Sequence, residues 1–267
     1  MPEGHTIHRA ARDQRPMLVG RTLSVGSPQG RFADGAASLD GRACTAIEAY
    51  GKHLLYAFEG ERTLHVHLGL FGSFRSARQP APEPRGAVRA RLQSATHAVD
   101  IVGPNRCEVL DPAGTAALCA RIGPDVLRAD AEPARAAARI RASRTAIGLL
   151  LMDQSVIAGI GNIYRTELLW RAGIHPSLPG ARLTATQFEA LWNDACALLA
   201  RGVKLGAIVT VDGAAAGRGR YRERVNIFGR DACPRCARPI RLIVMGGRKA
   251  YACEACQKRP RRIKGTA

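Results

Sequence analysis

The start of the chain carries apolar side chains at a helical spacing. They recur at Ile7, Ala10, Ala11, Met17 and Leu18, which fall on one face of a 3.6-residue repeat. Pro2 suits the first turn of a helix because it lacks the N–H that would have no partner there, and the acidic Glu3 follows it. The pattern predicts a helix over residues 2–18.

From about Thr22 to Leu110 the pattern changes to short runs that alternate or are rich in β-branched and aromatic residues. Examples are residues 54–58, 63–68 and 88–92, separated by Gly and Pro. Residues 79–86 form a proline-rich stretch without periodicity, which predicts a loop. This region is therefore expected to be an antiparallel β-sandwich.

The second half of the chain is predominantly helical. Residues 123–133 have the composition of an interdomain linker, and residues 207–219 form a Gly/Ala/Arg loop expected to be mobile without a ligand. Helices are predicted over 134–144, 147–152, 164–172 and 186–201. The fold class that follows is α+β with two domains.

The charge balance points to a polyanionic partner. The 267 residues include 40 Lys+Arg and 22 Asp+Glu, a formal net charge of +18. A basic surface of this strength favours nucleic acid, although only five of the basic residues are lysines, so arginine-rich composition accounts for part of the excess. The apolar stretches are too short to cross a bilayer and the start lacks the pattern of a signal peptide. A cytoplasmic, nucleoid-associated location is expected.

Four of the eight cysteines predict a metal site. Cys233 and Cys236 form one CxxC pair, Cys253 and Cys256 form another, and sixteen residues lie between the pairs. This spacing is typical of four thiolates around structural Zn²⁺, and the residues between the pairs read as a hairpin turning at Gly246-Gly247. A pair of redox dithiols is the alternative, but it lacks a thioredoxin-like βαβ context. A site with four protein ligands has no open position, so the catalytic chemistry must lie elsewhere.

The first residues offer such chemistry. Removal of Met1 would leave Pro2 as a secondary amine followed directly by the carboxyl group of Glu3. An α-amine titrates near pH ~8, so a usable fraction is nucleophilic at neutral pH. Its attack on an aldehyde-level carbon gives an iminium ion, an electron sink for elimination, while Glu3 could protonate a sugar ring oxygen. The alternative is an ordinary helix start.

Four separated segments resemble one known family. They are Pro2-Glu3-Gly4-His5-Thr6, Tyr50-Gly51-Lys52-His53-Leu54, the stretch from Met152 to Leu168 that contains Gly159-Ile160-Gly161-Asn162, and the C-terminal cysteine ribbon. In order and spacing they are similar to the formamidopyrimidine-DNA glycosylase / endonuclease VIII family of base-excision repair enzymes. The resemblance covers nearly the whole chain.

The resemblance implies roles for individual residues. Pro2 matches the nucleophile that attacks C1′ of the damaged nucleoside, Glu3 the proton donor, and Lys52 a lysine that assists glycosidic cleavage and β-elimination. Arg248, five residues before Cys253, matches an arginine that grips phosphates and donates the proton for δ-elimination.

The Gly159–Asn162 turn is expected to lead into a helix, with Asn162 as its cap and the helix N-terminus facing an anion. No strand precedes it, which excludes a dinucleotide-binding fingerprint. In the family this is the helix-two-turn-helix element, and the resemblance implies that Asn162 holds a DNA phosphate.

Two histidines and an apolar pair lie close together in the sandwich region. His65 and His67 share one strand face and could bind a metal, but no third ligand is nearby. In the family the following loop inserts a residue into the gap left by the extruded base, a role that Leu70 or Phe71 would fit.

The resemblance also implies a domain organisation. A catalytic N-terminal β-sandwich is expected over residues 1–122 and an interdomain linker over 123–133. The helix-two-turn-helix domain is expected over 134–225, the zinc ribbon over 226–258 and a basic tail over 259–267.

Two departures favour the endonuclease VIII branch, which is associated with oxidised pyrimidines. The chain starts Pro-Glu-Gly-His-Thr rather than Pro-Glu-Leu-Pro-Glu, and Asp100–Arg106 stands where oxidised-purine enzymes carry Asp-Pro-Arg-Arg-Phe-Gly. We expect a monomeric DNA glycosylase/abasic-site lyase that acts on damaged double-stranded DNA, contains structural Zn²⁺ and needs no small-molecule cofactor. The alternatives are an oxidised-purine glycosylase and a zinc-ribbon DNA-binding protein without catalysis.

Overall fold

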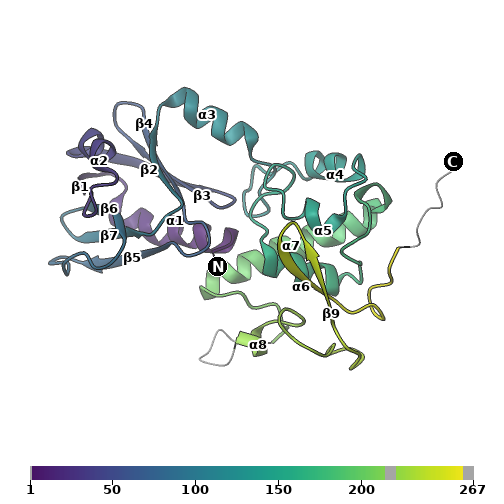
Figure 1. The fold of residues 1–267 in the computed structure, drawn as a ribbon. Helices are drawn as coiled ribbons and strands as arrows, with labels where there is room; N and C mark the ends of the chain where they lie inside the picture. Colours follow the sequence, from purple (N-terminus) through teal and green to yellow (C-terminus); the bar gives the residue numbers. More distant parts are fainter. Residues whose placement is uncertain (1, 214–220, 261–267) are drawn as a thin grey trace. The chain divides into compact units, whose positions relative to one another are not determined.

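A computed structural model describes residues 2–213 and 221–260 of the chain (Figure 1). The chain divides into two compact units, an N-terminal unit of residues 1–122 and a C-terminal unit of residues 123–267. Each has its own apolar core. None of the described helices combines the length and the apolar character that a membrane span requires.

The N-terminal unit is built on eight antiparallel strands. They are β1 (Arg21–Gly26), β2 (Arg42–Tyr50), β3 (His53–Phe58), β4 (Arg62–His67), β5 (Ser73–Arg78), β6 (Val88–Gln93), β7 (His97–Val102) and β8 (Arg106–Leu110). Their spatial order is β5-β7-β6-β1-β2-β3-β4-β8. The three sequence runs predicted as strands correspond to β3, β4 and β6, which confirms the antiparallel β architecture.

Strand β1 belongs to both halves of this sheet. Its residues 21–23 pair with residues 42–44 of β2, and its residues 24–26 pair with residues 91–93 of β6. Leu23 and Val25 are both buried, one in each half of the strand. The shared strand thus joins β2-β3-β4-β8 to β5-β7-β6 around one core.

Helix α1 (Gly4–Leu18) packs against β2 and β3. Its apolar face is the predicted one, with Ile7, Ala11 and Leu18 in the core. The helix begins at Gly4 with Glu3 as its N-cap residue, so the expected start at Pro2 is wrong by two residues. Pro2 precedes the helix.

Two further helices complete the N-terminal unit, α2 (Ala33–Leu39) and α3 (Pro112–Arg121). Neither was predicted. Helix α2 lies inside the stretch expected to be entirely β, and its seven residues bury only Ala36 and Leu39, too few to establish a helical repeat. Helix α3 is capped by Asp111, whose carboxylate accepts a hydrogen bond from the N–H of Gly114 at 2.7 Å.

The C-terminal unit contains the predicted helices with small shifts at their ends. They are α4 (Pro133–Arg141), α5 (Ile147–Leu150), α6 (Asn162–Arg171) and α7 (Ala185–Leu205), together with the 3₁₀ turn η1 (Gly180–Arg182) and the short α8 (Tyr221–Arg224). Thr184 and Gln187 form a reciprocal capping box at the start of α7.

The stretch predicted as a linker, 123–133, contains no helix or strand up to residue 132, and Pro133 is the first residue of α4, but its first part is packed. The N–H of Gly123 donates to the carbonyl of Gln154 at 2.8 Å, and the N–H of Ala158 donates to the carbonyl of Pro124 at 2.9 Å. Val126 lies in the core of the C-terminal unit, 5% exposed. These contacts fix the beginning of this stretch to the helical unit.

The predicted hairpin is present as β9 (Arg241–Met245) and β10 (Arg248–Ala252). Arg248 pairs with Met245, so the turn consists of Gly246 and Gly247. Both have positive φ, 55° and 70°, which glycine adopts without strain. The basic tail expected over 259–267 lies outside the described residues from 261 onward.

Candidate functional site

The beginning of the chain places an acid at the start of α1. Glu3 has extended backbone dihedrals and no solvent exposure, and its carbonyl accepts the N–H of Thr6 at 2.9 Å. Its carboxyl does not cap the helix. Pro2, directly before it, is half-buried. Removal of Met1 would make Pro2 a secondary amine beside this buried acid, an arrangement suited to proton transfer next to a nucleophile.

Lys52 occupies a tight turn between β2 and β3. Tyr50 pairs with His53, so Gly51 and Lys52 form the turn, and Gly51 has a φ of 57°. This geometry holds the lysine at the end of a rigid hairpin, half-buried.

Two contacts give the direction of α1 relative to that turn. The guanidinium of Arg15 donates to the carbonyl of Ile47 at 2.8 Å, and Val19 forms a bridge with Cys44. As α1 advances, its β2 partners therefore run backward, so the N-terminal end of α1 points toward the end of β2 where Lys52 follows. The fold of this unit thus directs Pro2 and Glu3 toward the Lys52 turn.

A chain of polar contacts follows Lys52 across three strands. Nδ1 of His53 lies 2.9 Å from Nε2 of His65, and Nδ1 of His65 lies 2.9 Å from a carboxylate oxygen of Glu108. If the carboxylate accepts the Nδ1 proton of His65, Nε2 of His65 accepts from His53, and Nε2 of a neutral His53 carries a lone pair. Burial, then the nearby charges of His67 and His65, lower the pKa of His53 to about 3. His53 is therefore neutral at physiological pH.

The metal site considered for His65 and His67 is not formed. Among residues 2–213 and 221–260, only the four ribbon cysteines gather closely enough to hold a metal ion. His65 is instead occupied by His53 and Glu108, while Nδ1 of His67 accepts the N–H of Gly69 at 3.2 Å. Sequence reasoning did not single out His53 or Glu108.

Leu70 and Phe71 lie at the tip of the loop between β4 and β5. Leu70 is 44% exposed and Phe71 is 94% exposed. The loop is tight, since the N–H of Gly72 donates to the carbonyl of Leu68 at 3.1 Å. Apolar side chains this exposed on a constrained loop are available to contact a ligand.

The start of α6 differs from the expected Asn cap. The N-cap residue is Gly161, and Asn162 is the first helical residue, only 5% exposed. Its side-chain amide donates to the carbonyl of Lys249 at 3.1 Å, and its oxygen accepts from the guanidinium of Arg165. The capping prediction is therefore wrong: the Asn162 side chain bonds Arg165 of its own helix and the carbonyl of Lys249 in β10, and it does not cap α6.

Arg248 is the first residue of β10, half-buried directly after the glycine turn. Strand β10 lies against α6, and Lys249, next to Arg248, supplies the carbonyl bonded by Asn162. Asn162 thus connects α6 to the strand that carries Arg248 within the C-terminal unit.

The four predicted zinc ligands converge on one point. Sγ of Cys236 lies 3.5 Å from that of Cys253 and 3.6 Å from that of Cys256, and Cys233 and Cys256 are 3.9 Å apart. Sulfurs about 2.3 Å from a tetrahedral Zn²⁺ would stand about 3.8 Å from one another, so the cluster fits this ion. Because all four sulfurs lie in one cluster, the structure argues against the alternative of two separate redox dithiols. The four cysteines therefore form a site for structural Zn²⁺.

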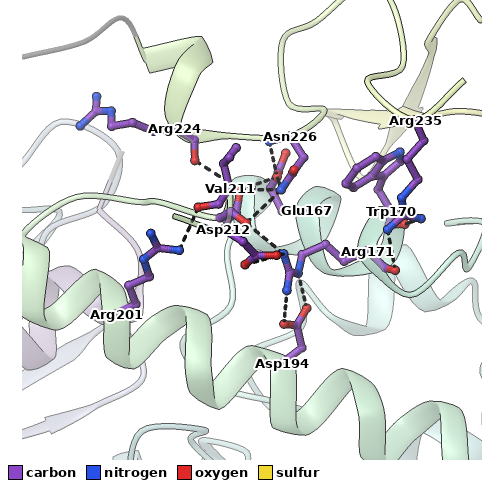
Figure 2. A network of polar contacts seen from close by, with 11 residues as sticks. Glu167, Trp170, Arg171, Asp194, Arg201, Val211, Asp212, Arg224, Asn226 and Arg235 are labelled. Carbon is purple, nitrogen blue, oxygen red and sulfur yellow. Dashed lines mark hydrogen bonds and ion pairs between the residues drawn. The ribbon is translucent and has the colours of Figure 1, made fainter. Parts of the chain in front are cut away.

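A second buried acid, missed by sequence reasoning, lies in the middle of α6 (Figure 2). Glu167 has no solvent exposure. One carboxylate oxygen accepts from the Thr210 hydroxyl at 2.5 Å and from the backbone and side-chain N–H groups of Asn226 at 2.7 and 3.0 Å. The other accepts from the N–H groups of Ile227 and Phe228, both at 2.8 Å. A single carboxylate therefore fixes residues 226–228 against α6.

Arg171, one turn further along α6, holds the preceding segment. Its guanidinium makes two bonds to Asp194 at 2.8 and 3.0 Å and one to the carbonyl of Thr210 at 3.0 Å, with Asp212 at 3.4 Å (Figure 2). Together with the Glu167 bonds to residues 226–228, these contacts fix the chain on both sides of residues 214–220. Residues 214–219 of the predicted 207–219 loop lie outside the described residues.

Comparisons with known proteins agree with this arrangement. Residues 1–107 match the formamidopyrimidine-DNA glycosylase N-terminal domain, residues 122–212 its H2TH domain, and residues 231–259 the zinc finger found in FPG and IleRS. Endonuclease 8 1 of Mycobacterium tuberculosis is 43% identical over 96% of this chain and 100% of its own. Formamidopyrimidine-DNA glycosylase of Chloroflexus aurantiacus is 36% identical over 96% and 98%.

Solved structures of Lactococcus lactis Fpg share the fold. One, a complex with DNA containing N7-benzyl-Fapy-dG, matches with a TM-score of 0.80 at 24% identity over 97% of this chain and all of that one. Together with the identities above, these matches confirm the predicted relationship, and this chain belongs to the formamidopyrimidine-DNA glycosylase / endonuclease VIII family.

Proposed function

We propose that this protein is a bifunctional DNA glycosylase and abasic-site lyase of base-excision repair that removes oxidised bases, pyrimidines in particular. The observation that carries the proposal is the fully buried carboxyl of Glu3 immediately after Pro2. The relatives named above, an endonuclease 8 and a formamidopyrimidine-DNA glycosylase, support the same activity.

In the proposed reaction the Pro2 nitrogen attacks C1′ of the damaged nucleoside. The N–C1′ bond forms and the bond from C1′ to the base breaks with its electron pair leaving on the base. The base takes up one proton, the Pro2 nitrogen loses one, and Glu3 protonates the ring oxygen as the sugar opens. The product is an iminium ion that stays cationic because a secondary amine has no second proton to lose. Loss of a C2′ proton then expels the 3′ phosphate by β-elimination.

Other residues take supporting parts in this proposal. Lys52 assists base loss and β-elimination, and Arg248 grips phosphates and donates the proton for δ-elimination where that second step occurs. Asn162 contributes to phosphate binding at the start of α6. The damaged base must leave the stack before C1′ can be reached, and Leu70 or Phe71 fills the gap.

The preference for oxidised pyrimidines rests on the endonuclease VIII-like start of the chain and on its relatives. Identity to the Mycobacterium tuberculosis endonuclease 8 is 43%, against 36% to the Chloroflexus aurantiacus formamidopyrimidine-DNA glycosylase. A panel of duplexes, each with one oxidised pyrimidine or purine, tests this preference. Faster release of oxidised purines would instead identify the protein as an oxidised-purine glycosylase.

The proposed partner is damaged double-stranded DNA, bound by a monomer in the cytoplasm at the nucleoid. The Lactococcus lactis neighbours are complexes with DNA that contains a modified base or an abasic site, which supports this partner. We assign catalysis to residues 1–122, DNA binding to 134–225 and the zinc ribbon to 226–258, with 123–133 between them and 259–267 as a basic tail.

Borohydride trapping tests the mechanism directly. Reduction of the iminium ion should join the protein covalently to abasic-site DNA, and the adduct should map to Pro2. Pro2→Gly should trap far less, and protein that retains Met1 should trap nothing. Absence of an adduct with a correctly processed N-terminus would refute the lyase mechanism. It would favour the alternative, a zinc-ribbon DNA-binding protein without catalysis.

A further inference from the structure

The zinc ribbon contacts the C-terminal end of α6 through one of its metal ligands. Nε1 of Trp170 donates a hydrogen bond to Sγ of Cys233 at 3.4 Å. Trp170 is 4% exposed and Cys233 is 2% exposed, and both belong to one small apolar cluster with Ile227 and Cys253. The contact is therefore shielded from water.

A residue between two ligands reinforces this contact. Arg235, which follows Cys233 by two residues, donates to the carbonyls of Trp170 and Arg171 at 3.1 Å each. Its guanidinium carbon lies 4.0 Å from the centre of the Trp170 ring (Figure 2). Arg235 thus bonds carbonyls in the last turn of α6, where a cation is favoured, and stacks on the indole that donates to the ligand.

The other end of α6 is held by the same ribbon. The side chain of Asn162 donates to the carbonyl of Lys249 in β10, next to Arg248. Helix α6 has 10 residues, which corresponds to about 15 Å. The ribbon therefore bonds the helix near both ends, with Cys233 at one end and the strand of Arg248 at the other.

We propose that Trp170 is an outer-sphere partner of the zinc ligand Cys233, and that Trp170 and Arg235 make the metal site and α6 one cooperative unit. A thiolate ligand carries negative charge, and an N–H donated to it is a charge-assisted bond that holds the sulfur in position. Metal occupancy then sets the position of α6 and, through Asn162 and Lys249, of the strand that bears Arg248. The metal and spectroscopic measurements below do not depend on the proposed enzymatic activity.

The chain supplies a matched pair of variants, because it has only two tryptophans. Trp170→Phe keeps the aromatic face under Arg235 and removes the N–H. Trp192→Phe is the control: Trp192 is on α7, 8% exposed, and its ring contact is with Phe188 at 6.0 Å between centroids. Both variants bury an aromatic ring in the same unit, and only one faces the metal site.

The first measurement is zinc transfer from the purified holoprotein to a colorimetric chelator. Loss of an outer-sphere partner is expected to weaken metal retention about 10–100-fold in Trp170→Phe. Wild type and Trp192→Phe should release zinc alike. Equal release by all three proteins would overturn the proposal.

The second measurement is spectroscopic and does not depend on stability. In Co²⁺-substituted protein, removal of the N–H raises the energy of the thiolate lone pairs, so the sulfur-to-cobalt charge-transfer band of Trp170→Phe should move to longer wavelength. Trp192→Phe should keep the wild-type band. An unchanged band in Trp170→Phe would overturn the outer-sphere assignment.

The third measurement tests the cooperative unit. In the Trp192→Phe protein, Trp170 is the only tryptophan, and chelation of zinc should change its emission strongly. In the Trp170→Phe protein, the emission of Trp192 should change little. Arg235→Gln, a substitution of an exposed residue that should fold, is expected to release zinc faster than wild type. If chelation leaves Trp170 emission unchanged, α6 is not coupled to the metal.

Discussion

Each unit contains a glutamate with no solvent exposure, and the two are held in different ways. Glu167 of α6 accepts hydrogen bonds from Thr210, from Asn226 and from the backbone of residues 227–228. Glu3 lies at the N-cap of α1, where its carbonyl rather than its carboxyl begins the helical bonding, and Pro2 directly precedes it. Burial alone therefore does not identify a reactive acid. A carboxylate surrounded by donors from a distant segment fixes that segment, whereas in the proposed mechanism the carboxyl of Glu3 exchanges a proton beside the amine that removal of Met1 leaves on Pro2.

The largest expected effect is the loss of base release when the carboxyl group of Glu3 is replaced. Glu3→Gln keeps the shape of the side chain and removes its proton, so base release from lesion-containing duplexes should fall about 10²–10⁴-fold. The melting temperature should change little. Glu61→Gln, at an exposed residue of the β3–β4 turn, should retain wild-type activity. Wild-type base release by Glu3→Gln would remove Glu3 from the proton transfer.

Glu167→Gln tests the opposite case. The amide would turn a donor toward groups that themselves donate, so we expect a loss of about 3–5 kcal/mol in the free energy of unfolding. Urea titration followed by tryptophan fluorescence measures this well, because both tryptophans lie in the C-terminal unit.

Glu189→Gln is the control for that measurement, since Glu189 is exposed on α7. It should leave stability unchanged. A Glu167→Gln protein as stable as wild type would show that the four bonds from Glu167 do not hold residues 226–228.

The histidines of the N-terminal unit give a pH prediction of intermediate size. The folded pKa of His53 is about 3, below its ordinary value of 6.5, because burial disfavours the charged ring. As the pH falls, the unfolded chain therefore binds the His53 proton before the folded chain does. The contribution of neutral His53 to the free energy of unfolding is fully present above pH 6.5 and is lost as the pH falls from 6.5 toward 3. At pH 4 the loss should be about 3 kcal/mol.

Hydrogen exchange in β3 and β4 measures this loss, because neither tryptophan lies in the N-terminal unit. His53→Gln should flatten the pH dependence, and His97→Gln should leave it in place. Equal pH dependence in both variants would assign the acid sensitivity to other groups.

These contrasts also explain what could be predicted from the sequence. The face of α1, the strand runs, the glycine turn and the CxxC pairs are local patterns, and the structure contains each of them. They could be found because the relevant residues lie within a few positions of one another. The roles proposed for Pro2 and Glu3 also rest on a local pattern, because the two residues are adjacent in the chain.

What could not be predicted depends on distant partners. Glu167 is bonded by residues 43 to 61 positions away, and His65 finds Glu108 43 positions later. The prediction that Asn162 caps α6 was wrong for the same reason, because its side-chain amide donates to the carbonyl of Lys249, 87 positions away. Local propensity for capping is worth about 1 kcal/mol, which a buried tertiary hydrogen bond equals or exceeds.

Phe71→Ala should give the smallest effect and the sharpest contrast with Glu167. A side chain that is 94% exposed contributes almost nothing to the folded state, so the melting temperature should not change. If Phe71 replaces the stacking lost when a base leaves the duplex, binding to a duplex with an abasic-site analogue should weaken by about 1–3 kcal/mol. Single-stranded DNA with the same analogue has no gap between paired neighbours, so its binding should change less.

Leu70→Ala, in the same loop at 44% exposure, distinguishes which of the two side chains enters the gap. Equal losses on duplex and single strand would make Phe71 a general stacking surface, because only the duplex loses paired neighbours on both sides of the extruded base.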